Sequence, residues 1–253
     1  KPFQRHFFRN DPSIWGWPAW PEAYRDPAAA AVSRFAVEQI EQVEFFEYLQ
    51  WQAELQLEAA GRKSWERGLG VGLYHDLALG VDRGGGEAWA QQGLYALGAS
   101  IGAPPDDFNL NGQDWGLPPM IPERLADAAY APFIATLRAN MRHCGALRID
   151  HVMGLMRLFW IPGGGTPATG AYVEYPLDDL MGIVALESQR NQCLVIGEDL
   201  GTVPDAVREA MARYGVLSYR LLYFEKQQDG VFKPPAAYPV QALVAVSTHD
   251  LPT

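Results

Sequence analysis

Apolar residues recur along the chain at spacings typical of buried helices. From residue 28 to about residue 67 they recur at steps of three and four, which places them on one face of a helix. The segment from Gln39 to Gln42 interrupts this run and favours two helices over one. The same period predicts three further helices, at residues 126–144, about 180–190 and 205–214.

Five short apolar runs alternate with these helices, and each ends in an acidic residue. They lie at residues 69–77, 145–152, 192–199, 216–225 and 241–250, and they end at or near Asp76, Asp150, Glu198, Glu225 and Asp250. Runs without a polar face predict strands of a parallel sheet covered by helices. Acidic groups at the same end of successive strands favour a (β/α)8 TIM barrel with its site at the C-terminal rim. A doubly wound open α/β sheet is the alternative.

Three segments lack a period. Residues 1–27 combine Trp and Pro and predict irregular structure, while residues 98–123 and 162–180 predict long loops, which are usually functional. A closed barrel needs eight strands, so we expect an incomplete barrel of about strands three to seven. We expect residues 1–253 to form the central part of one catalytic domain, with rim insertions near 98–123 and 161–180.

Composition narrows the classes of function. The 253 residues carry a formal net charge of −10 and no basic run, which argues against a nucleic-acid partner. Apolar stretches are strand-length, so we expect no membrane span, and no leader is visible. The two cysteines, Cys144 and Cys193, favour buried, reduced thiols in a cytoplasmic protein. Eight Trp and eleven Tyr residues suit sugar binding, although many of them would lie in a core.

One strand carries charge where packing residues are expected. Residues two apart on a strand share a face, so Arg148 and Asp150 point the same way. Burying an ion is costly unless it is paired, and these two residues can pair with each other. Asp150 then does chemistry while Arg148 keeps it ionised and oriented. A buried ion pair that only orders the strand explains the pattern equally well.

Glu198 and Asp250 end two further strands in the same way and can converge on Asp150. Two converging carboxyls are the minimum for cleaving a glycosidic bond, since one protonates the leaving oxygen and the other attacks or activates water. Scattered surface charge is the alternative. A metal hydrolase is a second one, because His151, Glu198, His249 and Asp250 are acceptable ligands. The chain lacks the zinc-binding motifs and the Gly-x-Ser-x-Gly nucleophile motif, so we expect no metal, no cofactor and no serine nucleophile.

Several motifs in order resemble those of a known family. They are GAPPD at residues 102–106, GQDWGLPP at 112–119, ALRIDHVM at 146–153, VIGEDLGTVP at 195–204 and STHDLPT at 247–253. From about residue 43 to 253 the chain resembles the amylomaltases, 4-α-glucanotransferases related to the α-amylases.

The resemblance implies roles for individual residues. Asp150 stands at the nucleophile, Glu198 at the general acid/base, and Asp250 at a carboxylate that binds sugar hydroxyls and supports the transition state. Further substrate-binding positions are implied at Arg148, His249, Asp76, Gln113, Trp115, Asp106 and His151, with Gln113 and Trp115 on a loop that covers the substrate. His75 departs from the family pattern, because relatives commonly have Arg beside the aspartate.

The implied activity is transfer of an α-1,4-glucan segment to the 4-hydroxyl of an acceptor by a retaining double displacement. The partners would be maltooligosaccharides and α-1,4-glucans, with glucose as an acceptor. An α-glucan hydrolase of the same clan and an inactive glucan-binding fragment are the remaining alternatives.

Overall fold

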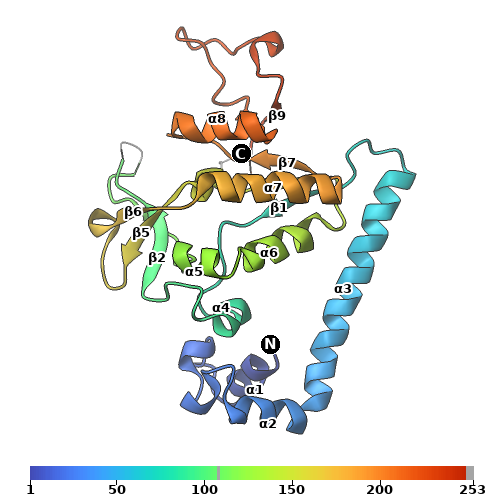
Figure 1. Ribbon diagram of the computed structural model, residues 1–253, viewed down its shortest axis with the longest axis vertical. Coiled ribbons are helices and arrows are strands. Elements are labelled where there is room, and N and C mark those ends of the chain that lie inside the picture. The colour runs from blue at the N-terminus through green and yellow to red at the C-terminus, as the bar shows by residue number, and fades with distance from the viewer. Residues whose placement is uncertain (107–108, 249–253) are drawn as a thin grey trace. The chain divides into compact units, whose positions relative to one another are not determined.

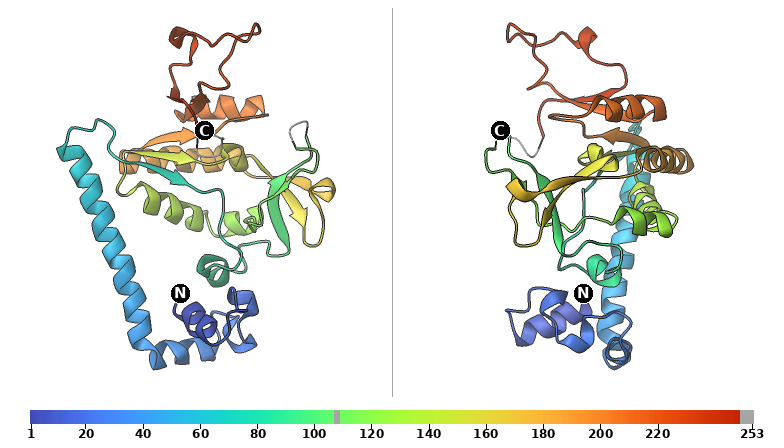
Figure 2. Two further views of the ribbon diagram at one scale, coloured as in Figure 1. Left: turned by 180° about the vertical axis from the view of Figure 1, so that it is seen from behind. Right: turned by 60° about the vertical axis from the view of Figure 1, so that its left-hand side comes forward.

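A computed structural model describes residues 1–106 and 109–248 (Figures 1 and 2). The chain forms two compact units. Unit 1 contains residues 1–60, 80–127 and 159–172, and unit 2 contains residues 61–79, 128–158 and 173 onward. No helix in the described part of the chain is long and apolar enough to cross a membrane.

Unit 2 is built on a sheet of five parallel strands in the order β1-β4-β7-β8-β9. The strands are β1 (Tyr74–Leu77), β4 (Ala146–Ile149), β7 (Leu194–Gly197), β8 (Leu217–Leu221) and β9 (Ala242–Ala245). Each strand lies beside the one that precedes it in the unit, so the order never reverses. A doubly wound sheet requires such a reversal, and the alternative of a doubly wound sheet is therefore wrong.

Three helices pack side by side on one face of this sheet (Figure 1): α6 (Ala131–Met141), α7 (Leu177–Asn191) and α8 (Asp205–Tyr214). Side chains that alternate toward this face, such as Leu147 and Val195, are almost fully buried. The opposite face carries a second buried cluster, formed by Ala146, Ile196, Tyr219 and Leu221. The segment between β8 and β9 contains a short 3-10 turn, η5 (Pro235–Ala237), and an isolated bridge between Lys226 and Phe232.

Two buried cysteines begin neighbouring strands. Cys144 and Cys193 are free thiols whose Sγ atoms lie 3.7 Å apart. The prediction that they are buried is confirmed in the structure.

The predicted helices are present: α8 has the predicted boundaries, and the others have shifted ones. The break at residues 39–42 is confirmed, since α2 (Ala30–Glu38) and α3 (Ile40–Glu66) meet at Gln39. The helix predicted over residues 126–144 is present as the shorter α6, and the preceding helix, α5 (Pro122–Asp127), is separate from it. Ala129 and Tyr130 separate them with left-handed φ values of 48° and 58°, a conformation that side-chain periodicity does not reveal.

Unit 1 has an aromatic core. Phe3, Trp17, Trp20 and Phe35 are buried together, with Phe3 and Phe35 stacked at 4.3 Å between ring centroids. The irregular structure predicted for residues 1–27 is wrong in part. The segment forms α1 (Pro2–Asn10) and two 3-10 turns, η1 (Trp17–Ala19) and η2 (Glu22–Tyr24). Unit 1 also contains the short helix α4 (Gly86–Ala90) and α5.

A small second sheet has the strand order β3-β2-β5-β6. Its strands are β2 (Ala99–Ala103), β3 (Gln113–Asp114), β5 (Arg157–Pro162) and β6 (Ala171–Glu174), with the turns η3 (Val152–Leu155) and η4 (Pro167–Thr169) nearby in the chain. The loops predicted over residues 98–123 and 162–180 therefore contain strands. A Cβ at Gly102 would lie 2.0 Å from the carbonyl oxygen of Gln113, so glycine allows β2 and β3 to meet.

Candidate active site

Strand register brings the charged residues of unit 2 to one face of the parallel sheet. Asp76 on β1 lies opposite Arg148 on β4, and Arg148 lies opposite Ile196 on β7. Because alternate residues share a face, Asp76, Arg148 and Glu198 all emerge on the face that also carries Tyr219. This end is the C-terminal edge of the strands, where parallel α/β folds build their sites.

Arg148 holds two carboxylates at once. Its Nη1 donates to Asp76 Oδ1 at 2.7 Å and Oδ2 at 2.8 Å, and its Nη2 lies 2.8 Å from Asp150 Oδ1. The arginine side chain is 6% exposed, whereas those of Asp76 and Asp150 are 44% and 38% exposed. The guanidinium also lies over the Tyr219 ring, 5.5 Å from its centroid. The predicted Arg148–Asp150 pair is confirmed, and Asp76 is a further partner of the same arginine.

Glu198 is fixed by backbone amides. His151 N donates to its Oε2 at 3.0 Å, and Leu200 N donates to its Oε1 at 2.7 Å. Two backbone bonds run between the same segments, from Glu198 N to Ile149 O at 2.9 Å and from Val152 N to Glu198 O at 3.1 Å. The turn that carries Asp150 is thereby bonded to the residue that carries the second carboxyl.

The turn takes an unusual backbone conformation to do this. His151 has φ 50° and ψ 57°, in the left-handed region, immediately before η3. That conformation turns the His151 amide toward Glu198 and directs the chain away from the line of β4. Backbone strain of this kind is often found at functional sites.

Burial raises the pKa of Glu198, and the neighbouring Asp150 charge acts in the same direction. The amides of Leu200 and His151 and the charge of Arg148 oppose that shift but do not cancel it. Burial lowers the pKa of His151 to about 4, so its ring is neutral at pH 7. The site thus combines an arginine-paired carboxylate with a buried carboxyl that holds its proton more tightly than an ordinary glutamate.

The structure does not test the roles predicted for five further site residues. Gln113, Trp115 and Asp106 belong to unit 1, where Trp115 Nε1 donates to Gln113 Oε1 at 2.9 Å. Their predicted contact with substrate stays a prediction. His249 and Asp250 lie outside the described residues, so their predicted roles also stay predictions.

His75 bonds a helix that covers the sheet. Its Nδ1 lies 3.0 Å from the carbonyl oxygen of Asn140 on α6, on the face of the sheet opposite Asp76. This histidine therefore bonds the covering helix instead of the carboxylate cluster. Within residues 1–106 and 109–248, no three His, Cys, Asp or Glu side chains are grouped as a metal site requires.

Two residues near the site were not predicted from the sequence. Tyr219 packs its ring against Arg148, and Asp199 is a fully buried carboxylate next to Glu198. Alternation along the predicted strand 216–225 is the only signal for Tyr219. Nothing in the sequence separates Asp199 from an ordinary loop aspartate.

A family model described as 4-alpha-glucanotransferase, glycoside hydrolase family 77, matches residues 5–253. The chain belongs to this family. It is 47% identical over 238 residues to the 4-alpha-glucanotransferase of Haemophilus influenzae, covering 94% of this chain and 34% of that protein. The Mycobacterium tuberculosis enzyme of the same name is 45% identical over 240 residues, which covers 93% of this chain and 33% of that enzyme. The chain thus spans about a third of the length of these relatives.

Solved structures of the family agree with the fold. The amylomaltase from Corynebacterium glutamicum superposes with a TM-score of 0.80 at 42% identity, over 84% of this chain and 30% of that one. The amylomaltase from Streptococcus agalactiae in complex with acarbose has a TM-score of 0.85 at 20% identity, over 99% and 52% of the two chains, and supports the fold alone. The resemblance found in the sequence is confirmed, and the five-stranded sheet is part of a TIM barrel of the glycoside hydrolase 77 type.

Proposed function

We propose that the protein containing this chain is a 4-α-glucanotransferase that moves an α-1,4-glucan segment to the 4-hydroxyl of an acceptor glucan or glucose. Family membership and the names of its relatives support this activity. The observation that carries it is the pairing of Asp150 with Arg148 beside a buried Glu198 of raised pKa. Retaining glycoside chemistry needs one ionised and one protonated carboxyl at the same bond.

In the first step the Glu198 carboxyl gives its proton to the glycosidic oxygen as the bond to the anomeric carbon breaks. An Asp150 oxygen attacks that carbon from the opposite side and forms a glycosyl ester. The shortened glucan leaves with the proton on its new 4-hydroxyl. Arg148 orients the attacking carboxylate through its 2.8 Å contact and stabilises its charge.

In the second step Glu198, now ionised, takes the proton from the 4-hydroxyl of an acceptor sugar. The acceptor oxygen attacks the anomeric carbon, the ester bond breaks, and Asp150 returns to its carboxylate form. Two inversions give net retention, and we expect the two carboxyls to lie about 5–5.5 Å apart. Water in place of the acceptor gives hydrolysis by the same residues.

Transfer to sugar instead of water requires that water be kept out of the site. We propose that Gln113, Trp115 and Asp106 serve this purpose on the substrate-covering loop. We assign Asp250 to transition-state support, and His249, Asp76 and His151 to sugar binding. We also propose that both units belong to one catalytic domain.

Maltooligosaccharides and α-1,4-glucans are the proposed substrates. The Streptococcus agalactiae amylomaltase was solved with acarbose, a sugar-like ligand consistent with glucan binding in the family. The buried free thiols support a reducing compartment, and we propose the cytoplasm.

Incubation of the protein at its natural length with maltotriose tests the proposal. Transfer converts two maltotrioses into glucose and maltopentaose, so we expect glucose together with chains longer than the substrate. Hydrolysis yields glucose and maltose alone, and that result would make the protein a glucan hydrolase. Loss of all activity with a chelator would instead favour the metal hydrolase.

A further inference from the structure

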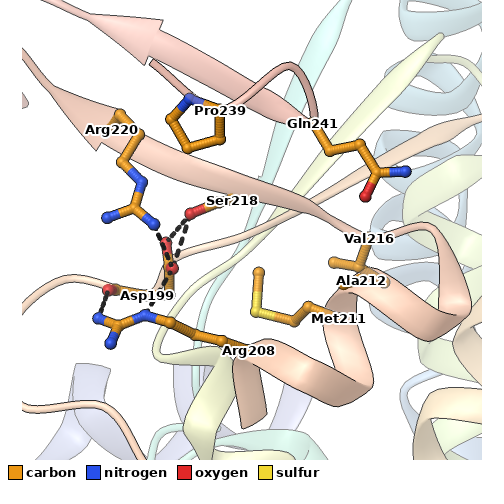
Figure 3. Close-up of a pocket in the computed structure, with 9 residues that line it drawn as sticks. All are labelled: Asp199, Arg208, Met211, Ala212, Val216, Ser218, Arg220, Pro239 and Gln241. Atoms are coloured by element: carbon orange, nitrogen blue, oxygen red, sulfur yellow. Dashed lines mark hydrogen bonds and ion pairs between the residues drawn. The ribbon is translucent and has the colours of Figure 1, made fainter. Parts of the chain in front are cut away.

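Asp199 follows Glu198 directly, yet its carboxylate lies on the opposite face of the sheet. It lines a pocket of about 160 Å³ formed by α8, β8 and the residues before β9. Figure 3 shows the residues around this pocket. The Asp199 side chain has no exposed area, so it makes no contact with a sugar on the other face. A carboxylate in such a position is costly unless the surrounding groups stabilise its charge.

The partners of Asp199 come mainly from β8. Ser218 Oγ lies 2.8 Å from Oδ1 and 2.7 Å from Oδ2, and Tyr219 N donates to Oδ1 at 2.9 Å. Arg208 of α8 reaches Oδ2 at 3.4 Å, and Arg220 reaches it at 3.7 Å. The close hydrogen bonds thus tie Asp199 to β8, while the two arginines are more distant (Figure 3).

These side-chain hydrogen bonds extend the backbone pairing between β7 and β8. The register of β7 with β8 runs through Ile196–Leu217 and Gly197–Ser218. One residue further on, the Asp199 side chain accepts the Tyr219 amide. The carboxylate therefore fixes how the end of β7, which carries Glu198, lies against β8.

The same bond acts on the other face of the sheet. Tyr219 is 6% exposed and supports the Arg148 guanidinium, which binds Asp150. Asp199 is thus connected to both proposed catalytic carboxyls, to Glu198 through the chain and to Asp150 through Tyr219 and Arg148.

We propose that Asp199 is a positioning residue for glucan transfer, holding Glu198 and the Tyr219–Arg148 pair in register from the far face of the sheet. This inference rests on the proposed function. Its effect is on geometry, and a misplacement of about 1 Å costs on the order of 100-fold in rate.

The test compares Asp199→Ala, Asp199→Asn and Ser218→Ala in the protein at its natural length, with rates referred to the folded fraction. Asp199→Ala should lower kcat about 100-fold with little change in KM. It should also move the alkaline limb of the kcat profile to lower pH as Glu198 becomes hydrated. Asp199→Asn still accepts the Tyr219 amide and should recover most of the rate. Ser218→Ala should show a smaller loss in the same direction.

Arg213→Ala is the matched control, because this exposed residue of α8 pairs with Asp178 and makes no contact with Asp199. It should leave kcat and the pH profile unchanged. A folded Asp199→Ala variant with wild-type kcat and an unshifted alkaline limb would overturn the inference. A wild-type protein that transfers no glucan would instead overturn the proposed function.

Discussion

The backbone amide of His151 donates a hydrogen bond of 3.0 Å to Glu198 Oε2. This bond links the residue after the proposed nucleophile to the proposed acid/base, although 47 residues separate them in the chain. A main-chain donor needs no rotamer of its own and is fixed once the turn is formed. The relative placement of the two carboxyls therefore depends on the left-handed turn at His151 as much as on the carboxyls themselves.

Replacing Arg148 should impair catalysis more than folding. Lysine offers a single ammonium in place of the fork that holds Asp76 and Asp150 together. Arg148→Lys and Arg148→Ala should each lower kcat about 100-fold. Because both aspartates are partly exposed and stay hydrated, the free energy of unfolding should fall by only about 1–3 kcal/mol.

Kinetics and urea unfolding measure the two effects separately. Arg124→Ala serves as the control, since Arg124 is exposed and lies as far as 4.0 Å from its exposed partner Asp127. It should change neither quantity. An Arg148 variant that unfolds with no separate loss of rate would make the pair purely structural.

The rate should depend on pH through Glu198. The donor step needs this carboxyl protonated, so kcat/KM should fall as the pH rises through its pKa. Burial raises that pKa, and the midpoint of the alkaline limb should lie above the ordinary glutamate value of about 4.3. In Glu198→Gln, assayed with a donor whose leaving group needs no proton, that limb should be absent. A limb that persists in the variant would assign the titration to another group.

Gly197 should tolerate no side chain. A Cβ there would lie 2.8 Å from Val152 Cγ2 and 2.9 Å from Met211 Cε. Gly197→Ala should therefore lower the free energy of unfolding by about 1–3 kcal/mol and displace the adjacent Glu198. Gly182 in α7 has open space at its Cβ position, so Gly182→Ala should be neutral or stabilising. Equal stability of the Gly197 variant and the wild type would contradict this packing.

The parallel sheet was predictable because its strands lie in apolar runs that end in charge. The second sheet was not, since β3 is only two residues long and β2 contains the glycine that the contact requires. Helix α1 lies in a segment whose tryptophans and prolines suggest irregular structure, and part of the packing of its Phe3 comes from partners distant in the sequence, Phe35 and Trp89.

Some contacts of the site were predictable from the sequence and others were not. The Arg148–Asp150 pair follows from alternation along one strand, and the structure confirms it. The bond from Arg148 to Asp76 depends on the register between β1 and β4. The Asp199 contacts depend on the register between β7 and β8. The sequence of a single strand does not determine its register with a neighbouring strand, so these partners could be identified only in the structure.

The most direct test of the account is the identity of the residue that carries the glycosyl group. The Glu198→Gln variant, at its natural length, would be incubated with a maltosyl fluoride, which reacts without an acid, and its peptides would be mapped by mass spectrometry. We predict a maltosyl ester on Asp150 that is absent in the Asp150→Asn, Glu198→Gln double variant. An ester on a different residue would contradict the claim that Asp150 is the nucleophile. A transfer product of inverted anomeric configuration from the wild-type protein would contradict the retaining mechanism.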